Sequence, residues 1–225
     1  AYVGLAGLVV LSWAIAPVLS FIVFLAISTF HFGRGDATSS VVGRGAVESI
    51  ARGSVVIGGI SQFHRTEAND IFLTIVGADT TGVWLFLDVL VVFGVACIVE
   101  TLLFKQQQER TAFGLEIGAL SLLFIAVPPL VGFAVYFCFV HSFRHFSSMR
   151  TVLQSTVSSL RITQTTVVFS LLTWAFGLVV LVQQSASIGV EPALLRVVFI
   201  GLAALTVPHM LLVDGFLGHT ASRRF

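Results

Sequence analysis

The chain has few charged residues, one lysine and two cysteines. Only 10% of its 225 residues are Asp, Glu, Lys or Arg, against roughly 25% in a soluble domain. The net charge of +1 excludes the basic surface that nucleic-acid binding requires. Lys105 stands at the end of an apolar segment, so no core helix offers a lysine for a Schiff base. Cys97 and Cys138 fall in apolar segments, which favours core thiols over a disulfide.

The sequence contains long apolar segments with few charged residues. Hydrophobic residues make up 56% of the sequence, and its mean hydropathy is +1.01. A membrane-spanning helix needs about 20 mostly apolar residues, and 20 glycines would let such helices pack closely. We therefore predict an all-α, polytopic transmembrane bundle of seven to eight spans, a single integral-membrane domain over residues 1–225 with the lipid bilayer as its surroundings. Its helices are expected near residues 1–14, 17–33, 41–63, 82–104, 111–127, 130–150, 162–183 and 193–217.

Basic and non-basic connections alternate along the chain, and this alternation predicts an orientation. Lys and Arg are enriched in cytoplasmic loops, so the basic connections and the C-terminus are expected on the cytoplasmic side. These regions contain Arg34, Arg44, Arg52, Lys105, Arg110, Arg144, Arg150, Arg161, Arg223 and Arg224.

The same orientation sorts the six histidines by depth. Four of them fall in the cytoplasmic halves of three separate helices: His31, His141, His145 and His209. His64 falls at the opposite face and His219 beyond the last span, and both are interpreted as surface residues. The four at similar depth are predicted to share a site.

His141 and His145 are four residues apart, so both imidazoles lie on one helix face. Ionisable groups at membrane depth are costly unless they have a function, and imidazole is a common metal ligand. Three or four histidines without an obligatory carboxylate suit Fe(II), Zn(II) or Cu(II). The alternative is polar residues near helix ends that bind water. His209 follows Pro208, and three roles stay open for it: ligand, donor to a ligand, or substrate-pocket residue.

Residues around the histidines have candidate supporting roles. Asp36 and Asp214 are candidates to orient a ligand imidazole by a hydrogen bond, although solvation at the membrane interface is slightly favoured for both. Some of the 21 phenylalanines are expected to line a tunnel for a long apolar substrate. The candidates for substrate contact are Phe30, Phe137, Phe139 and Met210.

Three motifs in order resemble the Brp/Blh family of bacterial and archaeal membrane β-carotene 15,15′-dioxygenases. They are His31-Phe32-Gly33 with Asp36, the segment His141-Ser142-Phe143-Arg144-His145, and Pro208-His209-Met210. The resemblance implies cleavage of the central double bond of all-trans-β-carotene by O₂ into two molecules of retinal, at a non-haem Fe(II). It implies His31, His141 and His145 as catalytic metal ligands and His209 as a further ligand candidate. It also implies a prokaryotic cytoplasmic membrane and a rhodopsin as recipient of the retinal.

One departure from the family concerns its first helix, where an earlier His-Gly motif is expected to supply a fourth ligand. No histidine precedes His31 in this sequence. Either an N-terminal segment is missing from the chain, which we favour because the chain begins abruptly in apolar sequence, or His209 completes the ligand set.

Other functions are weighed against this resemblance. A non-catalytic carotenoid- or retinal-binding membrane protein that assists opsin assembly is the main alternative, and pigment binding without turnover would distinguish it. An opsin is disfavoured by the position of Lys105, and a di-iron desaturase by too few histidines. A zinc metalloprotease is disfavoured because no His-Glu-x-x-His helix is present. A transporter with a histidine pathway stays open.

Overall fold

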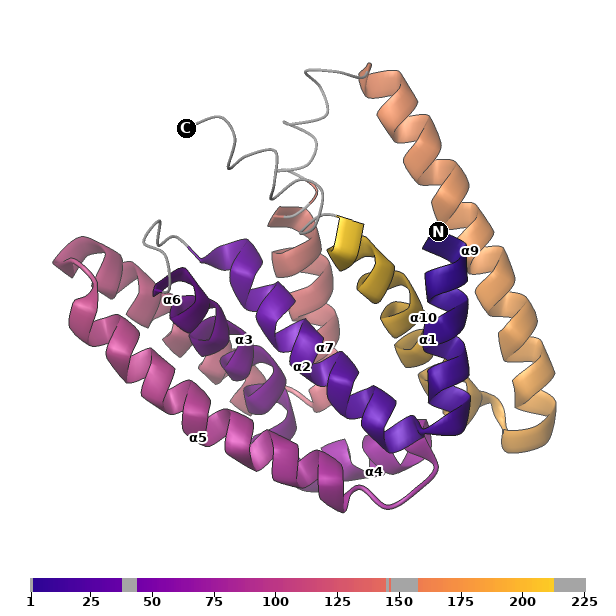
Figure 1. Ribbon diagram of the computed structural model, residues 1–225, viewed down its shortest axis with the longest axis horizontal. Helices are drawn as coiled ribbons and strands as arrows, with labels where there is room; N and C mark the ends of the chain where they lie inside the picture. The colour runs from indigo at the N-terminus through magenta and orange to yellow at the C-terminus, as the bar shows by residue number, and fades with distance from the viewer. Residues whose placement is uncertain (1, 38–43, 145, 147–157, 213–225) are drawn as a thin grey trace. The chain divides into compact units, whose positions relative to one another are not determined.

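The predicted all-α architecture is confirmed. The computed structural model describes residues 2–37, 44–144, 146 and 158–212, and this part of the chain is helical with short connections. Figure 1 shows the helices in order. They are α1 (Tyr2–Ile15), α2 (Pro17–Asp36), α3 (Arg44–Gln62), α4 (Arg65–Val76), α5 (Thr81–Phe104), α6 (Gln107–Ala126), α7 (Pro129–Val135), the π-helical turn η1 (Tyr136–His141), α9 (Ser159–Ile188) and α10 (Val190–Leu212).

Each apolar segment predicted from the sequence contains a helix, and the predicted break at Pro128-Pro129 separates α6 from α7. Helix α4 was not predicted, because its charged residues resembled a polar loop. It ends at Gly77, whose φ of 64° is the left-handed conformation that glycine adopts without strain. Cys97 is buried as predicted, whereas Cys138 is exposed, and both are free thiols.

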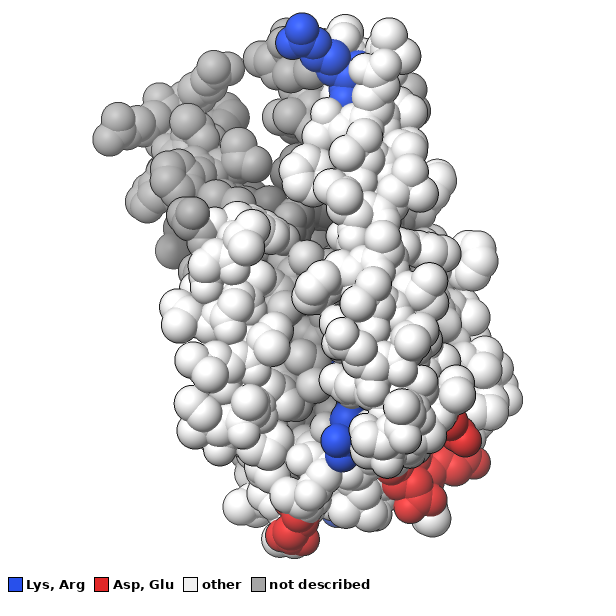
Figure 2. Space-filling view, turned by 90° about the vertical axis from the view of Figure 1, so that its right-hand side faces the viewer, with Lys and Arg blue, Asp and Glu red and all other residues white. Residues whose placement is uncertain are grey.

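Four helices in the described part of the chain are long and apolar enough to cross a membrane. The candidate spans are Pro17–Gly35, Thr81–Phe104, Ser159–Ile188 and Val190–Met210. Helix α1 and the helical segment Pro129–Arg144 are apolar but shorter. The seven to eight spans predicted from the sequence are therefore not shown. Among the described residues drawn in Figure 2, the charged ones lie near the upper and lower ends of the face, as expected of a surface that contacts lipid.

The chain divides into two compact units, Ser12–His141 and a second unit formed by Ala1–Leu11 with Ser142–Phe225. In the second unit α9 packs against α10, and the Tyr2 hydroxyl donates a hydrogen bond of 2.9 Å to the Leu205 carbonyl of α10. Helix α9 has no buried residue. Its apolar surface is therefore available to lipid.

In the first unit α3 is the central helix, with α2 and α5 packed against it. Glycine makes the α2–α3 crossing possible. A Cβ atom at Gly33 of α2 would overlap the backbone carbonyl of Ser49, and one at Gly53 of α3 would overlap the backbone carbonyl of Thr29. Since residues 33 and 29 meet residues 49 and 53 in reverse order, the two helices are antiparallel and their backbones touch.

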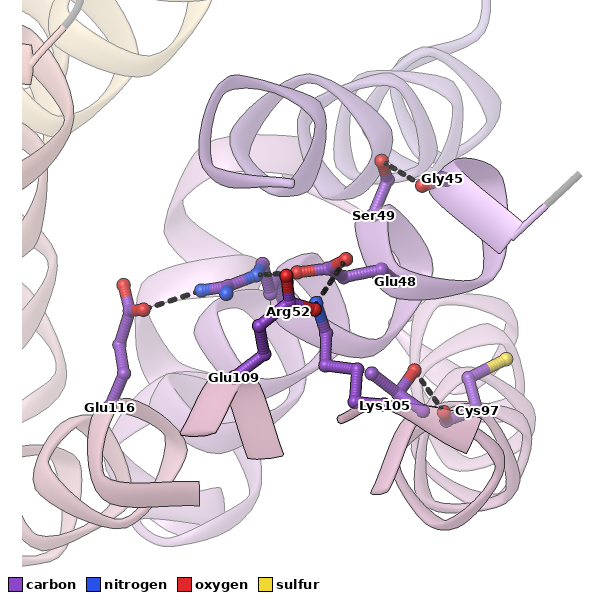
Figure 3. A network of polar contacts seen from close by, with 9 residues as sticks. Gly45, Glu48, Ser49, Arg52, Cys97, Lys105, Glu109 and Glu116 are labelled. Atoms are coloured by element: carbon purple, nitrogen blue, oxygen red, sulfur yellow. Dashed lines mark hydrogen bonds and ion pairs between the residues drawn. The ribbon is translucent and has the colours of Figure 1, made fainter. Parts of the chain in front are cut away.

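A buried ionic network joins α3 to α5 and α6 (Figure 3). The carboxylate of Glu48, 1% exposed, lies 3.0 Å from both Arg52 Nε and Lys105 Nζ. Arg52 Nη1 lies 2.6 Å from Glu116 Oε2 of α6. The Arg52 guanidinium thus donates hydrogen bonds to two carboxylates, that of Glu48 on its own helix and that of Glu116 on α6. Groups of opposite charge are therefore paired inside the unit.

Removing one member of this network should destabilise the fold. In Glu48→Gln, Arg52 and Lys105 lose their shared buried counter-charge, so the free energy of unfolding is expected to fall by about 3–5 kcal/mol. The matched control is Glu109→Gln, because Glu109 pairs with Lys105 at 3.6 Å but is 58% exposed; its loss is expected below about 1 kcal/mol. Unfolding titrations in mixed micelles would measure both variants. Equal losses in the free energy of unfolding would contradict the claim that the buried pairs stabilise the fold more than the exposed one.

Candidate active site

The structure brings two of the predicted histidines together. His31 lies near the C-terminal end of α2, and His141 is the last residue of η1. Their ring centroids are 5.0 Å apart, at an interplanar angle of 65°. Two elements separated by more than 90 residues of sequence therefore meet at these imidazoles, as the depth argument predicted.

Aromatic rings surround His141. The Phe32 ring meets it edge-on with centroids 4.7 Å apart, and the Tyr136 and Phe137 rings are stacked on it at 6.3 and 6.0 Å. His141 is only 8% exposed, and Tyr136 is fully buried. This shell keeps water away from the imidazole while leaving its neighbour His31 half-buried.

The π-helical turn sets the direction of His141. A π-helical turn has wider i→i+5 hydrogen bonding than an α-helix and frequently occurs at functional sites. It follows directly on α7, which begins at Pro129, where proline is tolerated because the first helical N–H has no partner within the helix. No sequence signal predicts this turn, because the four-residue spacing of His141 and His145 is typical of an α-helix.

The spacing of the two imidazoles fits a shared metal ion. With a metal–nitrogen bond of about 2.1 Å, two imidazoles bound to one ion at right or tetrahedral angles have centroids about 4.5–5.3 Å apart. The observed 5.0 Å lies in this range, which overlaps that of ordinary edge-on ring contacts. Within the described residues no group of three or more His, Cys, Asp or Glu side chains comes together, so the structure shows a pair of candidate ligands and not a complete set.

The other predicted site residues are placed less completely. His145 and Asp214 lie outside the described residues, and Asp36 is described only by its backbone at the end of α2. His209 is half-buried and Met210 is buried, both in the second unit.

The phenylalanines predicted to contact substrate separate into two groups. Phe137 stacks on His141. Phe139 is 74% exposed, and Phe30 is exposed with the Arg34 guanidinium over its ring. Phe32 and Tyr136, which make close ring contacts with His141, were not singled out from the sequence. Their adjacency to the histidine motifs was the only signal that could have identified them.

His64 has a structural position away from this pair. It precedes α4, and its Nε2 atom lies 3.0 Å from the Phe124 carbonyl near the end of α6. Because α2 and α3 are antiparallel, the end of α3 near His64 is opposite the end near His31. This placement supports the sorting of the histidines by depth, although His64 is half-buried and hydrogen-bonded rather than a free surface residue.

The apolar spans and the shielded histidine pair define a class, a helical membrane protein with a candidate metal centre. Comparison with known proteins gives the family. The profile described as Beta-carotene 15,15'-dioxygenase matches residues 1–217. A protein named Beta-carotene 15,15'-dioxygenase from Uncultured marine bacterium 66A03 is 33% identical over 216 residues, which cover 95% of this chain and 78% of that protein. No solved structure matches the chain. The chain belongs to the beta-carotene 15,15'-dioxygenase family, which is a family of enzymes.

The α2–α3 crossing should control the position of His31. Gly33→Ala places a methyl group against the Ser49 backbone, which cannot give way as a flexible side chain would. We expect α2 to shift and the bound metal per purified protein to fall several-fold. Gly35→Ala is the matched control in the same helix, because a Cβ there has no neighbour within 4 Å. Elemental analysis after purification would measure both variants; full metal content in Gly33→Ala would show that the crossing does not position the site.

Proposed function

We propose that this protein cleaves the central 15,15′ double bond of all-trans-β-carotene with O₂, giving two molecules of retinal, at a non-haem Fe(II) held by His31, His141 and His145. The family match over residues 1–217 is the observation that carries the proposal. The 5.0 Å spacing of the His31 and His141 rings supports it. His145 follows His141 by four residues, so a helix continuing past η1 would present it on the same face.

The residues present fit Fe(II) by their donor chemistry. Imidazole nitrogen suits iron among the first-row metals, and the family implies a cofactor for oxygen chemistry. A bound Fe(II) would supply the site at which O₂ is activated. His209 is proposed as a further ligand or as a pocket residue, and Asp36 and Asp214 as groups that orient ligand imidazoles.

The protein itself would position the substrate relative to the histidines and exclude water from the site. β-Carotene has no polar group to bind, so the cleavage site depends on where the polyene is held relative to the histidines. The rings of Phe32, Tyr136 and Phe137 provide apolar contacts around His141. No general base is needed for this reaction, which agrees with a shell around His141 that is built from aromatic rings.

A membrane location follows from the substrate as well as from the apolar helices. β-Carotene partitions into lipid, so it would enter laterally between helices, and retinal would leave by the same route toward a rhodopsin. We propose a prokaryotic cytoplasmic membrane with the C-terminus on the cytoplasmic side. The count of seven to eight spans stays a prediction.

Expression in a β-carotene-producing bacterium tests the reaction. The wild-type protein should convert β-carotene to retinal, detected by pigment extraction and chromatography. His31→Ala, His141→Ala and His145→Ala should each abolish retinal formation, because each removes a ligand. His64→Ala is the control and should retain most of the activity, since His64 bonds a carbonyl of α6 and lies away from the pair.

Each outcome bears on a different part of the proposal. Intact β-carotene with a folded, iron-loaded wild-type protein would overturn the dioxygenase proposal and favour pigment binding without turnover. Loss of activity in His64→Ala equal to that in His141→Ala would contradict the placement of the site.

His209→Ala distinguishes the two roles left open for this residue. If His209 is a ligand, the variant should lose iron together with activity. If it lines the pocket, the iron content should stay at the wild-type level while the KM for β-carotene rises. Iron content and KM measured on the same preparation would separate the roles, and wild-type values for both would exclude His209 from the site.

A further inference from the structure

Three rings form a continuous row along α7 and η1. Phe133 is stacked on Phe137 with centroids 5.6 Å apart and an interplanar angle of 18°. Phe137 is stacked in turn on His141 at 6.0 Å and 24°. The row therefore starts at the candidate metal ligand and extends about two helical turns, about 11 Å, toward Pro129.

The change from α-helix to π-helix keeps this row straight. Four residues exceed one turn of an α-helix, which has 3.6 residues per turn, so a row of residues at i, i+4 and i+8 normally drifts around the helix. In the wider π-helical turn four residues fall short of a full turn. Phe133 is in α7 and His141 is at the end of η1. The angular drift from Phe133 to Phe137 is therefore opposite in direction to the drift from Phe137 to His141, and His141 lies nearly in line with Phe133 along the helix.

The row presents apolar ring surface beside the reaction site. Phe133 and Phe137 are both half-buried, whereas Tyr136 on the same segment is fully buried in contact with Phe32 and Phe124. The segment thus has one face packed into the core and another formed by the half-buried rings of Phe133 and Phe137, which leads to the buried His141. A flat apolar chain lying along this second face would contact aromatic rings throughout its length.

We propose that the row Phe133–Phe137–His141 is the wall against which one half of the polyene lies, and that Phe133 is a specificity-determining residue for the length of that half. This proposal rests on the proposed dioxygenase function and deepens it. With the central double bond beside His141, the conjugated chain of one half runs past Phe137, and its outer part reaches Phe133. The ring of Phe133 therefore contacts the substrate far from the bond that breaks.

Phe133→Trp tests the proposal with two substrates. β-Carotene has two full-length halves, whereas β-apo-8′-carotenal has one shortened half that can lie along the row. A larger ring at Phe133 should raise the KM for β-carotene about tenfold, with kcat and iron content unchanged. For β-apo-8′-carotenal the KM should change less than about twofold. Phe93→Trp is the matched control in the same unit, because Phe93 of α5 is 55% exposed and lies off the row.

The outcomes separate this proposal from the proposed function. Two results would contradict the proposed role of the row while leaving the dioxygenase function intact. In both the wild-type protein forms retinal; in one Phe133→Trp changes the KM for the two substrates equally, and in the other Phe133→Trp is indistinguishable from Phe93→Trp. Failure of the iron-loaded wild-type protein to form retinal would overturn the function itself. If Phe133→Trp unfolds at a lower temperature than the wild type, Phe133→Leu replaces it; loss of the ring should then raise the KM for β-carotene more than that for the shortened substrate.

Discussion

The contact between the backbones of α2 and α3 is the constraint on which the candidate site depends. Ser49 and Gly53 of α3 lie against Gly33 and Thr29 of α2, with no room for a Cβ on either glycine. His31 lies between Thr29 and Gly33 in the sequence, so its backbone is held within one turn of both contacts. Close packing of this kind has little capacity to adjust, because interiors are packed as densely as crystals and transmit displacement.

The ionic network gives α3 a fixed position of its own. Glu48 and Arg52 are one turn apart on α3, and they bind Lys105 at the end of α5 and Glu116 on α6. Buried charges of this kind contribute little net stability compared with apolar packing, but their loss one at a time is costly. We interpret the network as a device that fixes the register of α3 against its neighbours. The close contacts at Gly33 and Gly53 then fix the position of α2, and with it His31, relative to α3.

Much of the fold could be predicted from the sequence because it depends on local composition. Apolar runs between polar clusters predicted the helices, and Pro128-Pro129 predicted the break between α6 and α7. Helix α4 was missed because its charged residues suit a solvated helix as well as a loop, and only packing of residues such as Phe72 into the core decides between them. The spacing of Gly45, Ser49 and Gly53 is a small-residue pattern typical of helix contacts. It does not identify α2 as the partner, because pairing is a long-range property.

The proximity of His31 and His141 could be predicted from the sequence, whereas the local geometry around them could not. Charge alternation and hydropathy together predicted a similar depth for His31 and His141, and the structure brings their rings together. The π-helical turn could not be predicted, since hydrophobic periodicity assumes regular α-helical geometry. The aromatic shell was also missed in part, because 21 phenylalanines in one chain give no indication of which few meet a histidine.

The central claim is that His31 and His141 bind one iron, and X-ray absorption spectroscopy of the iron-loaded protein tests it most directly. The account predicts at least three imidazole nitrogens bound directly to the iron in the wild type. It also predicts a reduced imidazole contribution in whatever iron His31→Gln and His141→Gln retain. A wild-type spectrum without imidazole scattering, or spectra unchanged in both variants, would contradict the account.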